Sequence, residues 1–342
     1  MDGTDYLSSN FSSSPFNFTP GYPDFDLSCQ IDAFVQSATA LFICILGLLG
    51  NGIFLFVVTR TRAFRTILDA LLINLCLADS TYLLGNACLS VCILYRKEHC
   101  VFLLHHKELC SLILINAAML YVSIFTIAVI GFERYMAVRK PLQNQLAGMS
   151  PRTRTAILII VCWSLGIVDM ASQAGVTQCV MFTADEWRKV YIDVIGILSI
   201  LVPMLCTITW YALTIRVLKR TPKTEGSSSG KKDDKQIIRM CVITASVAFI
   251  FSLPKCIQSL IALLELRDII RVKLGIKICL NNFAVYLLLL NSTVNPFIYN
   301  AVSSRYRRAF RNAFSRNHKV SPSGGYTNQL SSRQQNSLPQ GV

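Results

Sequence analysis

The sequence contains few charged residues for its length. Only 15% of its 342 residues are Asp, Glu, Lys or Arg, whereas 53% are hydrophobic, and the mean hydropathy is +0.47. Soluble globular domains carry roughly 25% charged residues, so the composition argues against an ordinary soluble domain. The first 33 residues contain no Lys or Arg and therefore lack the basic-then-apolar pattern of a signal peptide. We expect the first apolar segment to direct the chain to a membrane.

Seven long apolar segments take up most of the chain. Each approaches or exceeds the roughly 20 residues that a helix needs to cross the bilayer core, and lipid requires each one to satisfy its backbone hydrogen bonds internally. The predicted helices span residues 34–58, 67–94, 109–135, 155–178, 190–217, 237–265 and 274–302. The predicted fold is an all-α membrane protein, a seven-transmembrane helix bundle with a short amphipathic helix after helix 7.

The segments outside these helices are polar. The expected divisions are an extracellular N-terminal arm over residues 1–33, the bundle over 34–303, an amphipathic cytoplasmic helix over 304–315 and a disordered cytoplasmic tail over 316–342. In the short helix, Tyr306, Phe310 and Phe314 recur every four residues among arginines, which is typical of a helix lying on a membrane surface. The Gly/Ser/Lys-rich segment 221–236 is expected to be a disordered linker.

Basic residues gather in the loops on one side of the predicted bundle. They precede helix 2, lie between helices 3 and 4, fill residues 221–236 and follow helix 7. The positive-inside rule places these loops in the cytoplasm, so an odd number of helices places the N-terminus outside the cell. The formal net charge of +14 follows from this topology and from attraction to anionic membrane lipid, and it does not indicate nucleic-acid binding. Two N-glycosylation sequons, at Asn10 and Asn17, lie in the extracellular arm.

Polar residues and prolines recur inside the apolar helices in a defined order. From helix 1 to helix 7 these are Asn51, Asp79 in Leu-Cys-Leu-Ala-Asp, Glu133-Arg134-Tyr135, Trp163, Pro203 with Tyr211, Pro254, and Asn295-Pro296-Phe297-Ile298-Tyr299. One such motif per helix, each on the correct membrane side, resembles the rhodopsin-like (class A) G-protein-coupled receptor family over residues 34–314. The resemblance implies a multi-pass plasma-membrane receptor that is not an enzyme and activates a heterotrimeric G protein, with arrestin as a further partner.

The family resemblance also implies a conformational switch. In such receptors an acidic neighbour and an acidic residue at the inner end of helix 6 hold the arginine that closes helix 3. Here Glu133 and Asp234 would hold Arg134. Activation would swing helix 6 outward, free the arginine and turn Tyr211 and Tyr299 inward.

A cation site in the middle of the bundle is a further implication. Asp79, Ser123, Asn291, Ser292 and Asn295 match the positions from which these receptors build a sodium pocket, and hard cations prefer oxygen ligands. The alternative is a hydrogen-bonded water cluster. Apart from this allosteric sodium ion at Asp79, no cofactor is expected.

Two disulfides are implied on the extracellular side. One would join Cys110 at the top of helix 3 to Cys179 in the second extracellular loop. The other, between Cys29 and Cys279, resembles a bridge of chemokine and some nucleotide receptors, although Cys100 competes for the same partners.

Helix 6 departs from the family pattern in two places. Ser252 replaces the usual tryptophan two residues before Pro254. Lys255 follows the proline, where a charge near mid-membrane costs roughly 2.5 to 3.5 kcal/mol. Its partner is either an internal carboxylate, Asp169 or Asp193, or an anionic group of the ligand.

The ligand class follows only in outline. Amine receptors have an aspartate in the part of helix 3 that faces the ligand. The matching residue here is Asn116, or Ala117 if the position is counted from the cysteine at the top of helix 3, so an amine ligand is not expected. The long acidic arm favours an extracellular peptide, and Lys255 favours an anionic small molecule or lipid. A transporter or channel is the alternative function, but the sequence shows no internal repeat.

Overall fold

The structure, a computed structural model, describes residues 33–61, 66–95, 106–139, 150–177, 186–220 and 228–315. Within these ranges the chain is helical, with no β-strand. The helices are α1 (Ala33–Arg60), α2 (Ile67–Leu94), α4 (His106–Arg139), α6 (Pro151–Thr177), α7 (Glu186–Arg220), α8 (Ser228–Leu266), α9 (Leu274–Val302) and α10 (Ser304–Phe314).

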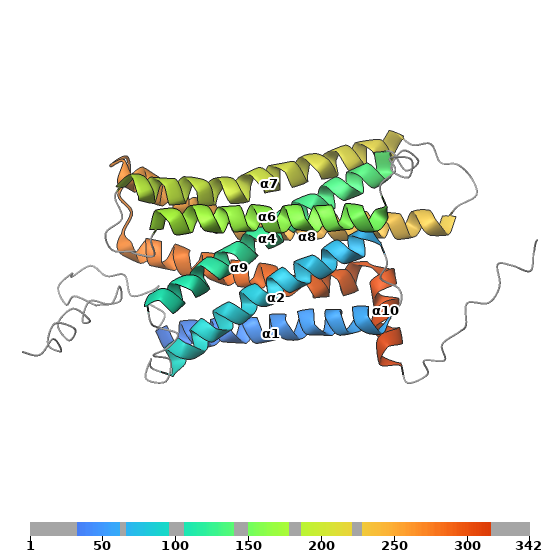
Figure 1. Cartoon of the computed structure of the whole chain (residues 1–342), viewed down its shortest axis with the longest axis horizontal. Coiled ribbons are helices and arrows are strands. Elements are labelled where there is room, and N and C mark those ends of the chain that lie inside the picture. The colour runs from blue at the N-terminus through green and yellow to red at the C-terminus, as the bar shows by residue number, and fades with distance from the viewer. Residues whose placement is uncertain are drawn as a thin grey trace, which may run out of the picture.

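Seven of these helices run alongside one another as a bundle, and α10 lies across one end of it (Figure 1). Each of the seven is long and apolar enough to cross a membrane. The seven-transmembrane fold with a short helix after the last span is therefore confirmed.

Helix α4 is the central helix of the bundle. It packs against α2, α6, α7 and α8, while α1 packs against both α2 and α9 and so closes the ring. The core between them is aliphatic, with fully buried side chains such as Leu75, Ile124 and Leu289. Leu205 and Val168 point outward and are exposed, as expected for helices that are apolar on all sides because lipid surrounds them.

Small residues allow close helix contacts at two positions of the bundle. A Cβ atom on Gly47 of α1 would lie 2.4 Å from Thr293 Oγ1 of α9, and one on Gly166 of α6 would lie 2.5 Å from Val122 Cγ2 of α4. Gly52 is different, because nothing lies within 4 Å of its would-be Cβ. Absence of a side chain is thus a packing requirement at Gly47 and Gly166.

The cytoplasmic end of α8 differs from the sequence-based expectation. Residues 228–236 were expected to belong to a disordered linker, but α8 already begins at Ser228. The segment is polar, so it carries no apolar periodicity that would predict a helix. It nevertheless contains Lys, Asp and Gln residues that a helix tolerates well, and the membrane-buried part of α8 supplies the nucleus from which the helix extends.

Candidate functional site

A fully buried carboxylate joins three helices in the middle of the bundle. Asp79 of α2 accepts hydrogen bonds from Ser123 Oγ of α4 at 2.8 Å and from Asn295 Nδ2 of α9 at 2.7 Å. One carboxylate oxygen faces each partner. Ser123 and Asn295, two of the residues predicted to surround Asp79, therefore lie against it.

The same region contains buried polar atoms without partners among the described residues. They are both side-chain atoms of Asn291, the hydroxyl oxygen of Ser292 and Oδ1 of Asn51. Asn291 lies one helical turn before Asn295 on the same face of α9. A carboxylate, two hydroxyls and amide oxygens are hard ligands, so this set fits a sodium ion chemically.

Other polar side chains in the membrane region hold neighbouring helices together. Asn51 of α1 donates from Nδ2 to the backbone oxygen of Ser292 at 3.0 Å. Asn74 of α2 donates to Thr126 Oγ1 of α4 at 2.9 Å and accepts from Trp163 Nε1 of α6 at 2.8 Å. These bonds satisfy groups that would otherwise be costly in lipid.

At the C-terminal end of α4, Glu133 forms its direct ion pair with a residue other than Arg134. Its carboxylate is bound by Arg154 of α6, with 2.6 Å between Nη2 and Oε2, and the two side chains are 5% and 21% exposed. Arg134 is half-buried, and its Nε has no hydrogen-bond partner among the described residues. Arg154 of the neighbouring helix thus forms the direct ion pair with Glu133, while Arg134 interacts with the same carboxylate electrostatically without a direct ion pair among the described residues. Asp234 lies in α8, but its side chain is outside the described residues.

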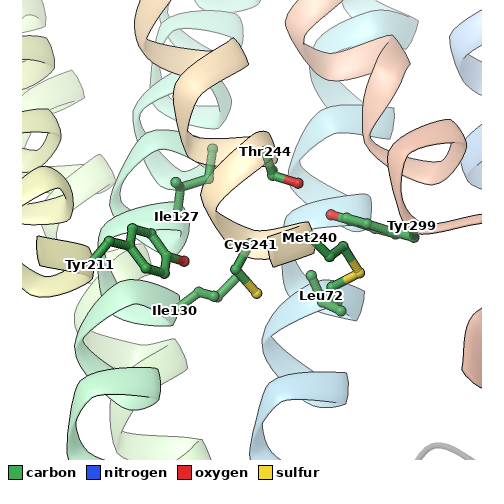
Figure 2. Close-up of a pocket in the computed structure, with 8 residues that line it drawn as sticks. All are labelled: Leu72, Ile127, Ile130, Tyr211, Met240, Cys241, Thr244 and Tyr299. Atoms are coloured by element: carbon green, nitrogen blue, oxygen red, sulfur yellow. The ribbon is translucent and has the colours of Figure 1, made fainter. Parts of the chain in front are cut away.

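Two tyrosines from opposite sides of the bundle face a small cavity (Figure 2). Tyr211 of α7 and Tyr299 of α9 are both buried, and their hydroxyls, like that of Thr244 on α8, lack partners among the described residues. The cavity has a volume of about 10 Å³ and is lined by Leu72, Ile127, Ile130, Tyr211, Met240, Cys241, Thr244 and Tyr299. That volume matches a single water molecule, and three hydroxyls are enough to hold one.

An aromatic cluster stands between α4 and α7 on the same level. Trp210 packs against Phe132 with ring centroids 5.2 Å apart and against Tyr135 at 5.3 Å. The Tyr135 hydroxyl accepts from Arg139 one turn further along α4. Arg134 thus sits between two helix-bridging groups, the Glu133 ion pair and this cluster.

Helix α10 is anchored to the bundle through Asp69 of α2. This residue forms a capping box with Thr66 at the start of α2, and its carboxylate also binds Arg305 at 2.6 Å and accepts from the Tyr306 hydroxyl at 3.0 Å. Tyr306 is fully buried and packs against Phe54 and Tyr299. Burial raises the pKa of Tyr306 well above its usual value, and the Asp69 charge raises it further, so the phenol stays protonated and donates.

In the other half of the bundle, Lys255 is bound by groups of the protein. Its Nζ donates to Gln258 Oε1 at 3.2 Å, and Gln258 Nε2 in turn donates to Asn281 Oδ1 of α9 at 2.9 Å. Asp193 of α7 interacts with Lys255 electrostatically, without a direct ion pair among the described residues. Asp169, the other proposed partner, instead accepts from the hydroxyl of Ser199.

The remaining predicted residues of helices 3 and 6 are buried. Asn116 packs against α2 at Gly85, where a Cβ would lie 2.0 Å from the amide oxygen of Asn116. Ser252, which stands in the usual tryptophan position, is also buried, and its hydroxyl lacks a partner among the described residues.

The cysteines include one bridging residue that the sequence did not indicate. Cys92 at the end of α2 and Cys279 at the start of α9 are both disulfide-bonded. Free thiols in the described part of the chain are Cys44, Cys76, Cys88, Cys162, Cys206, Cys241 and Cys256. The predicted bridging residues Cys29 and Cys179, the Cys110 side chain and the sequons at Asn10 and Asn17 lie outside the described residues.

Comparison with known proteins shows the family to which this chain belongs. The family model of the seven-transmembrane receptors of the rhodopsin family matches residues 50–299. The chain belongs to this receptor family. It is accordingly a seven-span membrane receptor and not an enzyme, and the transporter alternative is set aside.

Relatives of this rhodopsin-family receptor include receptors that are named for peptides. Somatostatin receptor type 2 of Sus scrofa is 26% identical over 321 residues, which cover 88% of this chain and 84% of that receptor. Neuropeptide FF receptor 2 of Mus musculus is 26% identical over 318 residues, covering 82% and 73%. Somatostatin receptor type 5 of Rattus norvegicus is 25% identical over 281 residues, covering 79% and 75%.

Several functional contacts of the receptor were missed at the level of sequence. Arg154 counted only as a cytoplasmic positive charge, although it binds Glu133. Asp69 carried a readable signal, because Thr66-x-x-Asp69 is a capping-box pattern, but its contacts with α10 join residues more than 230 positions apart.

Proposed function

We propose that this receptor binds an extracellular peptide and activates a heterotrimeric G protein at the plasma membrane, with its N-terminus outside the cell. The observation that carries the proposal is the position of Arg134. It lies at the cytoplasmic end of the central helix, half-buried, with Nε free of hydrogen bonds among the described residues. A guanidinium with an unused Nε–H donor at the mouth of a helix bundle suits a backbone carbonyl of an inserted partner segment.

In this proposal, signalling consists of an outward movement of the cytoplasmic part of α8. Pro254 lies inside α8 and removes one backbone hydrogen bond, so it provides a point at which the helix bends. The movement opens a cleft beside Arg134. Tyr211 and Tyr299 then stabilise the open form through the small cavity between them, and arrestin is a second partner for the same cleft.

The Asp79 site regulates this equilibrium as a sodium site. Asp79, Ser123, Asn291, Ser292 and Asn295 would hold the ion, whose charge compensates the buried carboxylate. Because these residues come from α2, α4 and α9, an ion that they share favours the arrangement in which the three helices are close together.

The peptide relatives support a peptide ligand, and Lys255 gives that ligand a chemical preference. A buried ammonium whose nearest carboxylate makes no direct ion pair can bind an acidic group of the ligand, with Asp193 as the competing internal partner. Asn116 on α4 lies toward the same end of the bundle and is the second proposed ligand contact.

The test measures nucleotide exchange on a panel of purified G proteins by the receptor in lipid nanodiscs, first without ligand and then with a peptide library. Arg134→Ala should abolish exchange with normal folding, since the G-protein contact is lost. Arg60→Ala, which removes an exposed arginine at the cytoplasmic end of α1, is the matched control and should leave exchange intact. Exchange by Arg134→Ala at the wild-type rate would refute the proposed coupling site.

A further inference from the structure

A glutamine side chain in the cytoplasmic part of α8 contacts the start of α10. Gln236 Oε1 of α8 accepts two hydrogen bonds from Ser304, one from its backbone N–H at 3.0 Å and one from its hydroxyl at 2.7 Å. Both donors belong to the first residue of α10. One amide oxygen therefore joins two helices through residues that are 68 positions apart in the sequence.

Gln236 caps the N-terminus of α10. The first N–H groups of any α-helix lack partners within the helix and need an acceptor from outside. Ser303, the N-cap residue of α10, makes no side-chain capping bond. Gln236 supplies the acceptor from another helix, at the end of α10 where the helix dipole favours a negative partial charge.

Helix α10 is held to the rest of the bundle by contacts that do not involve α8. Asp69 of α2 binds both Arg305 and Tyr306, and Tyr306 packs against Tyr299 of α9. Val57 of α1 packs against the Ala309 side of α10. These contacts tie α10 to α1, α2 and α9, and Gln236 adds a contact between α10 and the N-terminal part of α8, which itself also packs along α9.

The fastening point lies far from the bend of α8. Gln236 stands 18 residues before Pro254, which is about 27 Å along a helix at about 1.5 Å per residue. A rotation about the proline moves residues in proportion to their distance from it. A small outward rotation therefore separates Gln236 from Ser304 early in the movement.

We propose that the Gln236–Ser304 contact is an autoinhibitory latch that holds α8 in the closed position. The inference rests on the proposed function, because it assumes that signalling requires α8 to move outward. Opening then costs two hydrogen bonds and leaves the first turn of α10 uncapped. The latch requires no ligand, so it sets the basal activity of the receptor.

Substitutions at Gln236 should shift basal activity in opposite directions. Gln236→Ala removes the acceptor and should raise basal nucleotide exchange by about threefold to tenfold, as expected for the loss of one or two hydrogen bonds. Gln236→Glu replaces the amide with a carboxylate, a stronger acceptor at the α10 N-terminus, and should lower it. Ser304→Ala removes only the hydroxyl donor and should give a smaller rise.

The experiment compares these variants in nanodiscs, with exchange expressed per folded receptor and no ligand added. The double variant Gln236→Ala/Ser304→Ala should resemble Gln236→Ala alone, because both changes remove the same contact. If Gln236→Ala fails to fold, Ser304→Ala and Gln236→Glu carry the comparison.

Two further outcomes separate the latch from the proposed function. The latch is overturned if basal exchange depends on Arg134 but is unchanged in both Gln236→Ala and Gln236→Glu. It is likewise overturned if the two variants change basal exchange in the same direction. Basal exchange that survives Arg134→Ala overturns the proposed coupling site instead, whatever Gln236 does.

Discussion

The Glu133 carboxylate of α4 binds Arg154 of α6 at 2.6 Å, so the acidic group that adjoins Arg134 in the sequence is already occupied. Glu133 is buried and acidic, and its interaction with Arg154 is a charge-assisted hydrogen bond. Two arginines thus compete for one carboxylate at the proposed coupling site. If Arg154 retains Glu133, the carboxylate is less available to hold Arg134 than the proposed switch requires.

The first prediction concerns this competition. Arg154→Ala leaves Glu133 free to bind Arg134, so basal nucleotide exchange should fall by about threefold or more. Adding Glu133→Gln to the same variant removes the new pair and should restore exchange. A rise in basal exchange on Arg154→Ala alone would contradict the competition.

The second prediction concerns the proposed cation site. An ion that binds only the folded receptor stabilises it, by about 1.4 kcal/mol at ten times its dissociation constant. The melting temperature of the purified receptor should therefore be higher in sodium chloride than in N-methyl-glucamine chloride, and Asp79→Asn should abolish the difference. Thr81→Ala on the same helix, whose exposed hydroxyl bonds only to Leu77 O, should retain it. Equal sodium dependence in both variants would place the ion elsewhere.

The third prediction compares two glycines of α1. Gly47→Ala forces a methyl group against Thr293 and Leu83 and should destabilise the receptor by about 1 to 3 kcal/mol. Gly52→Ala meets no neighbour and should stabilise the helix by up to about 1 kcal/mol. Thermal unfolding of the two purified variants checks the sign of each change, and a destabilised Gly52→Ala would show that packing around α1 differs from this structure.

The fourth prediction concerns Cys92. Loss of a disulfide in an extracellular region typically costs about 2 to 5 kcal/mol, so Cys92→Ser should sharply reduce the amount of receptor at the cell surface. Cys88 lies one helical turn earlier with a free thiol, and Cys88→Ser should have little effect. Peptide mapping without reduction should find Cys92 and Cys279 only in disulfide-linked peptides and Cys88 as a thiol.

The fifth prediction concerns Lys255 and Asp193. If the charges of Lys255 and Asp193 compensate each other, Lys255→Met and Asp193→Asn should each lower the melting temperature. The double variant should then lose less free energy of unfolding than the sum of the two single losses, by about 0.5 to 3 kcal/mol. Additive effects would mean that Asp193 does not compensate Lys255, leaving the ammonium available to a ligand carboxylate.

The sequence was sufficient for the architecture because membrane helices are governed by strong local constraints. Every one of the seven helices could be recognised from its length and hydrophobicity, and the motifs placed Asp79 opposite Ser123 and Asn295. Partner choice was harder. Glu133 has arginines near it from two helices, and only the rotation of α6 about its axis determines that Arg154 reaches the carboxylate.

Contacts of the cytoplasmic surface were also beyond sequence reasoning. Residues 228–236 are polar throughout, so their helical state depends on continuation from the membrane-buried part of α8 and not on a pattern of their own. Gln236 could not be assigned a partner until that helix was placed beside α10. Cys92 resembled the buried thiols of the bundle, because its position in an apolar run gives no sign of a disulfide partner.

The aromatic cluster at the inner end of α4 gives this receptor an optical property. The chain has three tryptophans, and with Ser252 in the usual position none of them lies in α8. Trp210 packs directly against Tyr135, the residue next to Arg134. Its ultraviolet emission therefore responds to a change in polarity or quenching at the coupling site, without any attached dye. A change in the fluorescence of the unmodified protein on partner binding would be measured over a background from Trp163, which is partly buried and bonded to Asn74, and from the exposed Trp187.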